Sequence, residues 1–65
     1  MKISDIKVGH VYTNGKQGTD SLVTRILWAA GSGGIVSFTY LEMPYEMNIQ
    51  DFADWAVEDL GEVEQ

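Results

Sequence analysis

Residues 21–41 read SLVTRILWAAGSGGIVSFTYL, and this stretch determines the type of fold that we expect. β-Branched and aromatic residues dominate both of its halves, and such residues favour a pleated chain. The glycine-rich segment at residues 31–34 divides the halves and can reverse the chain, because glycine tolerates positive φ. We therefore predict two antiparallel strands, over residues 21–30 and 35–41, joined by a short turn.

The second of these strands is apolar on both faces. Alternation along the strand places Val36, Phe38 and Tyr40 on one face and Ile35 and Leu41 on the other. A strand with two partly apolar faces fits a curled sheet that a helix covers. We therefore expect a strongly bent, barrel-like sheet.

The N-terminal part of the chain predicts one more strand and a loop. Apolar and polar residues are interleaved up to Thr13, which favours a strand from about residue 8 to residue 13. Asparagine and glycine are frequent at residues 14–20, so this segment is predicted to be a loop too long for a two-residue hairpin.

The C-terminal part predicts an amphipathic helix. Pro44 is expected to break strand pairing, and Asn48 is a good N-cap before a helical pattern over residues 49–60. Gly61 is expected just beyond the helix end, with a frayed tail after it. At about 100° per residue, two sets of side chains face opposite ways. The apolar side holds Ile49, Phe52, Ala53, Ala56, Val57 and Leu60, and the acidic side holds Asp51, Asp54, Glu58 and Glu62.

Together these patterns predict an α+β fold with a small, bent antiparallel sheet of three or four strands and one C-terminal amphipathic helix. The 65 residues are expected to form a single domain, residues 1–65. A chain of this length buries only about 60% of its unfolded surface, so the core is marginal. There is no cysteine, so disulfides and thiolate chemistry are excluded.

The charge of the chain is unevenly distributed. Residues 42–65 hold eight acidic side chains and no lysine or arginine, whereas residues 1–41 have a formal balance of +2, and the net charge is −6. Direct binding to nucleic acid is disfavoured, because phosphates attract surplus cations. No segment has the apolar run of a signal peptide or membrane span, so we expect a cytoplasmic location, in the host cell if the chain is phage-encoded.

The acidic helix face is the strongest candidate site. Its like charges at i,i+4 and the acids near the helix C-terminus oppose helix formation, so selection for binding a basic partner would explain them. The alternative interpretation is that the acidic face binds no partner and only keeps a small domain soluble. Two aromatic residues near this face could serve as interface anchors. The predicted partner-binding residues are Tyr45, Asp51, Asp54, Trp55, Glu58 and Glu62.

Other kinds of site have weaker support. Lys16 and Arg25, with the glycine loops, could bind a small anion such as a nucleotide, which is the alternative function. A homo-oligomer that completes the marginal core is a further alternative. His10 is the only histidine, so a catalytic triad or a multi-histidine metal site within one chain is excluded. We expect no enzyme activity, no metal and no cofactor.

The segments Ile6–Tyr12 and Leu22–Ile26, with the glycine-rich loop between them, resemble the opening of SH3-like small barrels. The segment Ile49–Ala56 resembles the Phe-Ala-x-Trp-Ala helix of short bacteriophage and prophage proteins. This resemblance implies a phage setting, in which a small acidic protein binds and disables host machinery, including defence systems. It implies no catalytic residues.

Overall fold

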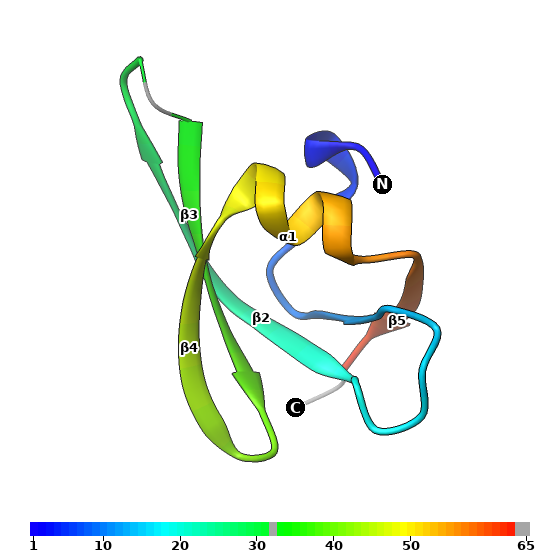
Figure 1. Cartoon of the computed structure of the whole chain (residues 1–65). Helices are drawn as coiled ribbons and strands as arrows, with labels where there is room; N and C mark the ends of the chain where they lie inside the picture. The colour runs from blue at the N-terminus through cyan, green and yellow to red at the C-terminus, as the bar shows by residue number, and fades with distance from the viewer. Residues whose placement is uncertain (32, 64–65) are drawn as a thin grey trace.

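The computed structural model describes residues 1–31 and 33–63, and these form one five-stranded antiparallel sheet with one α-helix (Figure 1). In chain order the elements are a 3-10 turn (Ile3–Asp5), β1 (His10–Thr13), β2 (Ser21–Ala29), β3 (Gly33–Tyr40), β4 (Met43–Asn48), α1 (Ile49–Trp55) and β5 (Glu58–Glu62). The strand order in the sheet is β4-β3-β2-β1-β5. The predicted α+β class is confirmed, but the expected count of three or four strands is wrong.

The two predicted central strands are confirmed as the hairpin β2–β3. Seven residue pairs join them, with one register shift between Val23 and Arg25. Gly34 belongs to β3 and lies opposite Trp28, and a Cβ on Gly34 would lie 2.9 Å from a carbon of the Trp28 ring. This close approach explains why a glycine occupies a buried strand position. Ser32, within the predicted turn, lies outside the described residues.

β4 corrects the prediction that Pro44 breaks strand pairing. All six residues of β4 pair with β3, and Pro44 lies opposite Thr39. A tight turn precedes β4, in which Leu41 and Glu42 both have positive φ, 51° and 65°. Proline is tolerated because β4 is at the edge of the sheet, where a missing N–H can face away from the ladder.

The helix is shorter than predicted, since α1 ends at Trp55 rather than at residue 60. Ala56 is extended, with φ −74° and ψ 131°. The N–H of Val57 donates to the carbonyl of Thr13 on β1, 2.9 Å away. Like charges and the negative helix end oppose further helical turns, and pairing with β1 gives the backbone another partner.

β5 replaces the predicted last helical turns, so Glu58 and Glu62 lie on a strand and not on the helix face. Gly61 is not a helix cap either, since it is within β5 with φ 103° and lies opposite Val11. The N–H of Val63 still donates to the Gly9 carbonyl at 2.9 Å, so pairing continues past the expected helix end. Residues 64–65 of the predicted frayed tail lie outside the described residues.

The hydrophobic core lies between α1 and the bent sheet. Figure 1 shows α1 crossing in front of the sheet, with the N-terminal turn beside it. The helix contributes its apolar side, as predicted for its first two turns, and β1, β2 and β3 contribute the facing side chains. The buried apolar residues are Ile6, Tyr12, Val23, Val36, Phe38, Ile49, Phe52, Ala53 and Ala56.

The start of the helix is predicted correctly, and it gives a testable expectation. The Asn48 side-chain oxygen accepts a hydrogen bond from the Gln50 N–H at 2.8 Å, which caps α1. We expect Asn48→Ala to lower the free energy of unfolding by about 1 kcal/mol. Urea denaturation followed by circular dichroism measures this change. Asn48→Asp keeps an acceptor oxygen and should lose much less, whereas equal losses in both variants would contradict the capping role.

Candidate functional site: an aromatic groove

A hollow of the described surface lies between α1 and strands β3 and β4. Its volume is about 340 Å³, which is at the lower end of the range for ligand pockets. Aromatic and other apolar side chains form most of its wall. We call this hollow the aromatic groove, and it is lined by Thr19, Ser21, Phe38, Tyr40, Tyr45, Met47, Phe52 and Trp55.

Strand alternation and the helical repeat bring the lining residues together. The β3–β4 register pairs Phe38 with Tyr45, and their rings stack with centroids 5.8 Å apart. Phe52 and Trp55 are three positions apart on α1, so both point toward the same side, with ring centroids at 5.5 Å. Phe52 also packs on Phe38, at 5.1 Å. The groove therefore has a wall of mutually packed rings.

Exposure of the rings differs between the floor and the rim of the groove. Phe52 is fully buried and Phe38 nearly so, whereas 47% of Tyr45 is exposed and Trp55 is half-buried. The rim residues thus offer apolar area that a partner could cover. Large aromatic side chains in such positions are common anchors of protein interfaces.

Two hydroxyl groups in the wall of the groove are engaged within the chain. The Thr19 hydroxyl donates to the Lys16 carbonyl at 2.7 Å, and the Ser21 hydroxyl donates to the Thr19 carbonyl at 3.3 Å. Within residues 1–31 and 33–63, no charged side chain lines the groove. The lining therefore favours an apolar ligand group over an anion.

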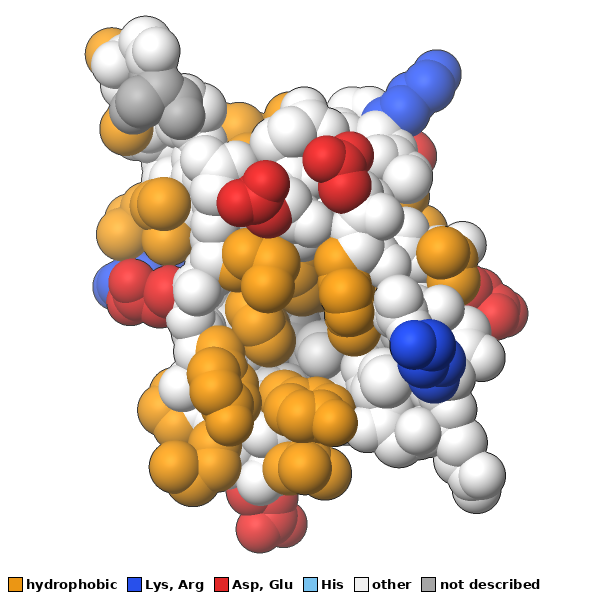
Figure 2. Space-filling model, in the orientation of Figure 1, with side chains coloured by type: hydrophobic (Ala, Val, Ile, Leu, Met, Phe, Trp, Pro, Cys, Tyr) orange, Lys and Arg blue, Asp and Glu red, His pale blue; other side chains and the backbone are white. Residues whose placement is uncertain are grey.

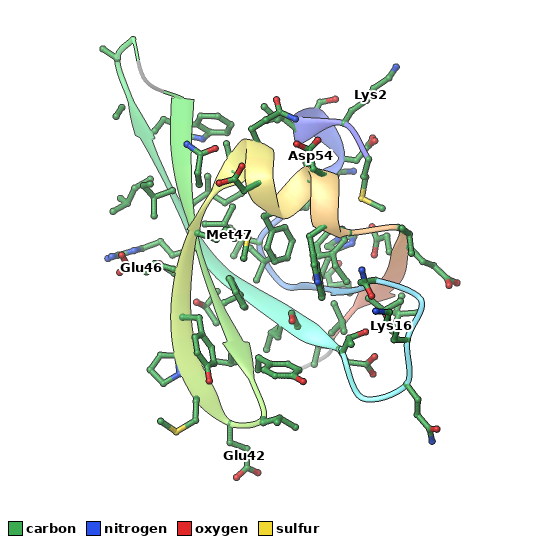
Figure 3. The ribbon with its side chains drawn as sticks, in the orientation of Figure 1. Lys2, Lys16, Glu42, Glu46, Met47 and Asp54 are labelled. Atoms are coloured by element: carbon green, nitrogen blue, oxygen red, sulfur yellow. The ribbon has the colours of Figure 1, made fainter. Side chains whose placement is uncertain are left out.

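Charged side chains stand around the groove rather than inside it. Figure 2 shows apolar side chains gathered on the face that carries the groove, with acidic side chains above and below them. Figure 3 identifies Asp54 above, on α1, and Glu42 below, in the β3–β4 turn, with Lys16 on the loop at the right. Asp54 is exposed and accepts a hydrogen bond from the Gln50 side chain at 3.0 Å.

Four of the six predicted partner-binding residues belong to the groove or to the helix beside it. Tyr45 and Trp55 line the groove, and Asp51 and Asp54 are exposed on α1. The two aromatic residues thus line the groove, and the two acids lie on the helix that borders it. The role of these residues in binding a partner stays a prediction.

The other two predicted residues lie elsewhere. Glu58 and Glu62 are exposed on β5, at the opposite edge of the sheet from β4. On the same strand Asp59 is within hydrogen-bond distance of His10, with 2.9 Å between Oδ2 and Nδ1. The structure therefore divides the predicted acidic array into a helix pair and a separate strand group, because the helix ends at Trp55.

The two cations of the predicted anion site lie on different elements. Lys16 is in the loop between β1 and β2, whereas Arg25 is within β2 and pairs with Ser37 of β3. Both are exposed. No interaction among the described residues brings them together, so nothing in the structure adds support to the nucleotide alternative.

Sequence reasoning missed the groove residues Phe38, Tyr40 and Met47 as a site, and assigned most aromatic residues to the core. The signal was present in the spacing: positions 36, 38 and 40 alternate, as do 43, 45 and 47. The second series was not recognised as part of a strand, because Pro44 was expected to break strand pairing.

Two other features were sought in the described parts of the chain, a metal-ligand cluster and a membrane-spanning helix. Residues 1–31 and 33–63 contain no cluster of three or more histidine and acidic side chains that could hold a metal ion. In the same ranges, every helix is too short or too polar to cross a membrane. Comparisons with protein families, with curated proteins and with solved structures give no match. The functional interpretation therefore depends on the groove and its surroundings.

Proposed function

We propose that this chain is a non-catalytic protein-binding module that holds an apolar segment of a cationic partner in the aromatic groove. The observation that supports it is the hollow of about 340 Å³, lined by aromatic rings, in a chain of net charge −6. Apolar burial in the groove provides binding energy, and the surrounding carboxylates favour a partner with a basic surface.

The setting of this function follows from the resemblance to phage and prophage proteins. We propose that the partner is a host protein, with a defence component as one such target, and that the chain acts as an accessory or inhibitor. We also propose that the bent sheet is an SH3-like barrel. The consecutive strands β1 to β4 and the return of β5 to the side of β1 support that fold.

Capture of partners from host lysate tests the proposal. We expect Tyr45→Ala and Trp55→Ala each to weaken binding by at least about tenfold, as is typical of aromatic anchors. Trp28→Ala is the matched control, because Trp28 is 65% exposed and lies away from the groove on the β2–β3 hairpin. Circular dichroism confirms that each variant is folded. Unchanged capture by both groove variants would refute the proposal.

Variants that neutralise single groups of acids distinguish binding at the groove from a general effect of negative charge. Asp54→Asn should weaken capture at low salt, and the difference should shrink at high salt because charges are screened. The double variant Glu58→Gln/Glu62→Gln changes acids on β5, far from β4 in the strand order, and should have the smaller effect. A larger loss in the β5 variant would move the site to the other sheet edge.

A further inference from the structure

The strand that borders the aromatic groove is also an open edge of the sheet. Among residues 1–31 and 33–63, β4 pairs with β3 alone, and the first four residues of β4 are exposed. Alternation divides its side chains: Tyr45 and Met47 line the groove, whereas Glu46 faces the opposite side of the sheet. A segment held at the groove could therefore also meet the free backbone groups of β4.

Pro44 indicates which backbone groups of β4 are free. Proline has no N–H and fits a strand where its nitrogen faces away from the hydrogen-bonded neighbour. Because residues two apart point their backbone groups the same way, Pro44 and Glu46 direct theirs outward. The N–H and carbonyl of Glu46 thus form the centre of the free edge.

The outward edge also has a defined charge pattern. On the face opposite the groove, Ser37 of β3 pairs with Arg25 of β2 on one side and with Glu46 of β4 on the other. A row of side chains thus runs across the sheet from a cation to an acid and stops at the edge. The next position in this row would belong to an added strand, where a cation complements Glu46.

We infer that the partner segment of the proposed function is an extended, cationic strand that pairs with the edge of β4. Its alternate apolar side chains lie on the groove side, beside Tyr45, and its lysine or arginine side chains lie beside Glu46. Main-chain hydrogen bonds to Glu46 supply affinity, and the alternation supplies specificity. This inference rests on the proposed function, since it assigns a conformation and a sequence pattern to the same ligand.

A second copy of this chain is the less favourable occupant. β4 carries an acid and no cation, so two β4 edges would bring like charges together, and Pro44 shortens the run of free N–H groups. Both features discourage self-pairing, while Glu46 attracts a cationic strand.

The test uses an octapeptide of alternating lysine and valine, with blocked ends. In the Trp28→Phe variant, Trp55 is the remaining tryptophan and its fluorescence reports on the groove. We expect this peptide to bind, and an alternating glutamate and valine peptide not to bind. Two further lysine–valine peptides, N-methylated on all valines or on all lysines, each lack the N–H donors of one strand edge. At least one of them should bind about tenfold more weakly, since two or more hydrogen bonds are lost.

Site-specific readouts locate the binding. The amide of Glu46 should exchange hydrogen more slowly when the lysine–valine peptide is bound. Glu46→Gln should weaken this binding about two- to fivefold at low salt, as for an exposed ion pair. Glu62→Gln, on the other edge strand, is the matched control and should leave the affinity unchanged.

Several outcomes would overturn the inference. They are no binding of the lysine–valine peptide, binding of both methylated peptides as tight as that of the unmethylated one, slowed exchange on β5 instead of β4, and a dimer of the chain alone with protected β4 amides. Binding that depends on Trp55 but tolerates both methylated peptides would reject strand pairing and leave the proposed function intact. Partner capture that is unchanged by Tyr45→Ala and by Trp55→Ala would instead reject the proposed function itself.

Discussion

Phe52→Ala is expected to unfold most of the protein at 25 °C. The Phe52 side chain is fully buried, and its ring packs against Tyr12, Phe38 and Trp55 with centroid distances of 5.7, 5.1 and 5.5 Å. Removal of a buried phenylalanine ring costs about 3–5 kcal/mol, because apolar burial is lost and a cavity remains. A core of this size rarely supplies more than about 3–5 kcal/mol of net stability, so little would be left.

Urea denaturation followed by circular dichroism measures the effect. Leu41→Ala is the matched control, because 73% of Leu41 is exposed and its loss should change stability by no more than about 0.5 kcal/mol. Phe52→Leu keeps much of the apolar volume and should retain a cooperative transition. A wild-type unfolding midpoint in Phe52→Ala would show that the helix does not contribute the centre of the core.

Tyr12→Phe is expected to destabilise the fold by about 1–3 kcal/mol, although it removes a single oxygen atom. The Tyr12 side chain has no exposed surface. Its hydroxyl donates to the Asp5 carbonyl and accepts from the Lys7 N–H, both at 2.7 Å. Loss of the hydroxyl leaves these two backbone groups of the N-terminal segment without that partner.

The same hydroxyl predicts a loss of stability at alkaline pH. Burial raises the pKa of Tyr12, and the charges of Asp59 and Asp5 raise it further, while the Lys7 N–H opposes the shift. An unfolded tyrosine ionises near pH 10, whereas the folded side chain keeps its proton to higher pH. The contribution of protonated Tyr12 to the free energy of unfolding is therefore complete below about pH 10. It is lost as the pH rises toward the pKa of Tyr12 in the folded protein.

Urea denaturation at pH 8 and at pH 10 to 11 tests this predicted loss of stability. The wild-type free energy of unfolding should fall over this range, and the difference between wild type and Tyr12→Phe should become smaller. Val11→Ala, at a neighbouring half-buried position without a hydroxyl, should lose stability without changing the pH dependence. A Tyr12→Phe variant with the full wild-type alkaline loss would assign that loss to other groups.

The central hairpin and the helix start were predictable because short-range rules govern them. Residues 21–41 combine β-branched and aromatic residues with glycines at the reversal, and the structure pairs β2 with β3 there. Asn48 caps α1, as the side-chain preference for that position indicates. In both places local preference and tertiary structure agree.

The helix end and β4 were not predictable in the same way. Residues 56–60 continue an amphipathic helical pattern, but the backbone there pairs with β1, more than 40 positions earlier in the chain. Pro44 discourages a strand unless that strand is at the edge of the sheet, and only the strand order shows that β4 is. Both errors arise because a periodicity does not reveal which distant segment offers hydrogen bonds.

The candidate site likewise combines features that the sequence shows with features that only the tertiary structure shows. Residue types and their positions in the chain establish the acidic C-terminal part, the many aromatic residues and the lack of cysteine, since these features do not depend on folding. The groove exists only because α1 stops at Trp55 and β4 pairs with β3, so that Tyr45 and Trp55 line one hollow. Glu58 and Glu62 leave the helix for the opposite sheet edge because β1 satisfies their backbone, and that long-range pairing decides which acids surround the groove.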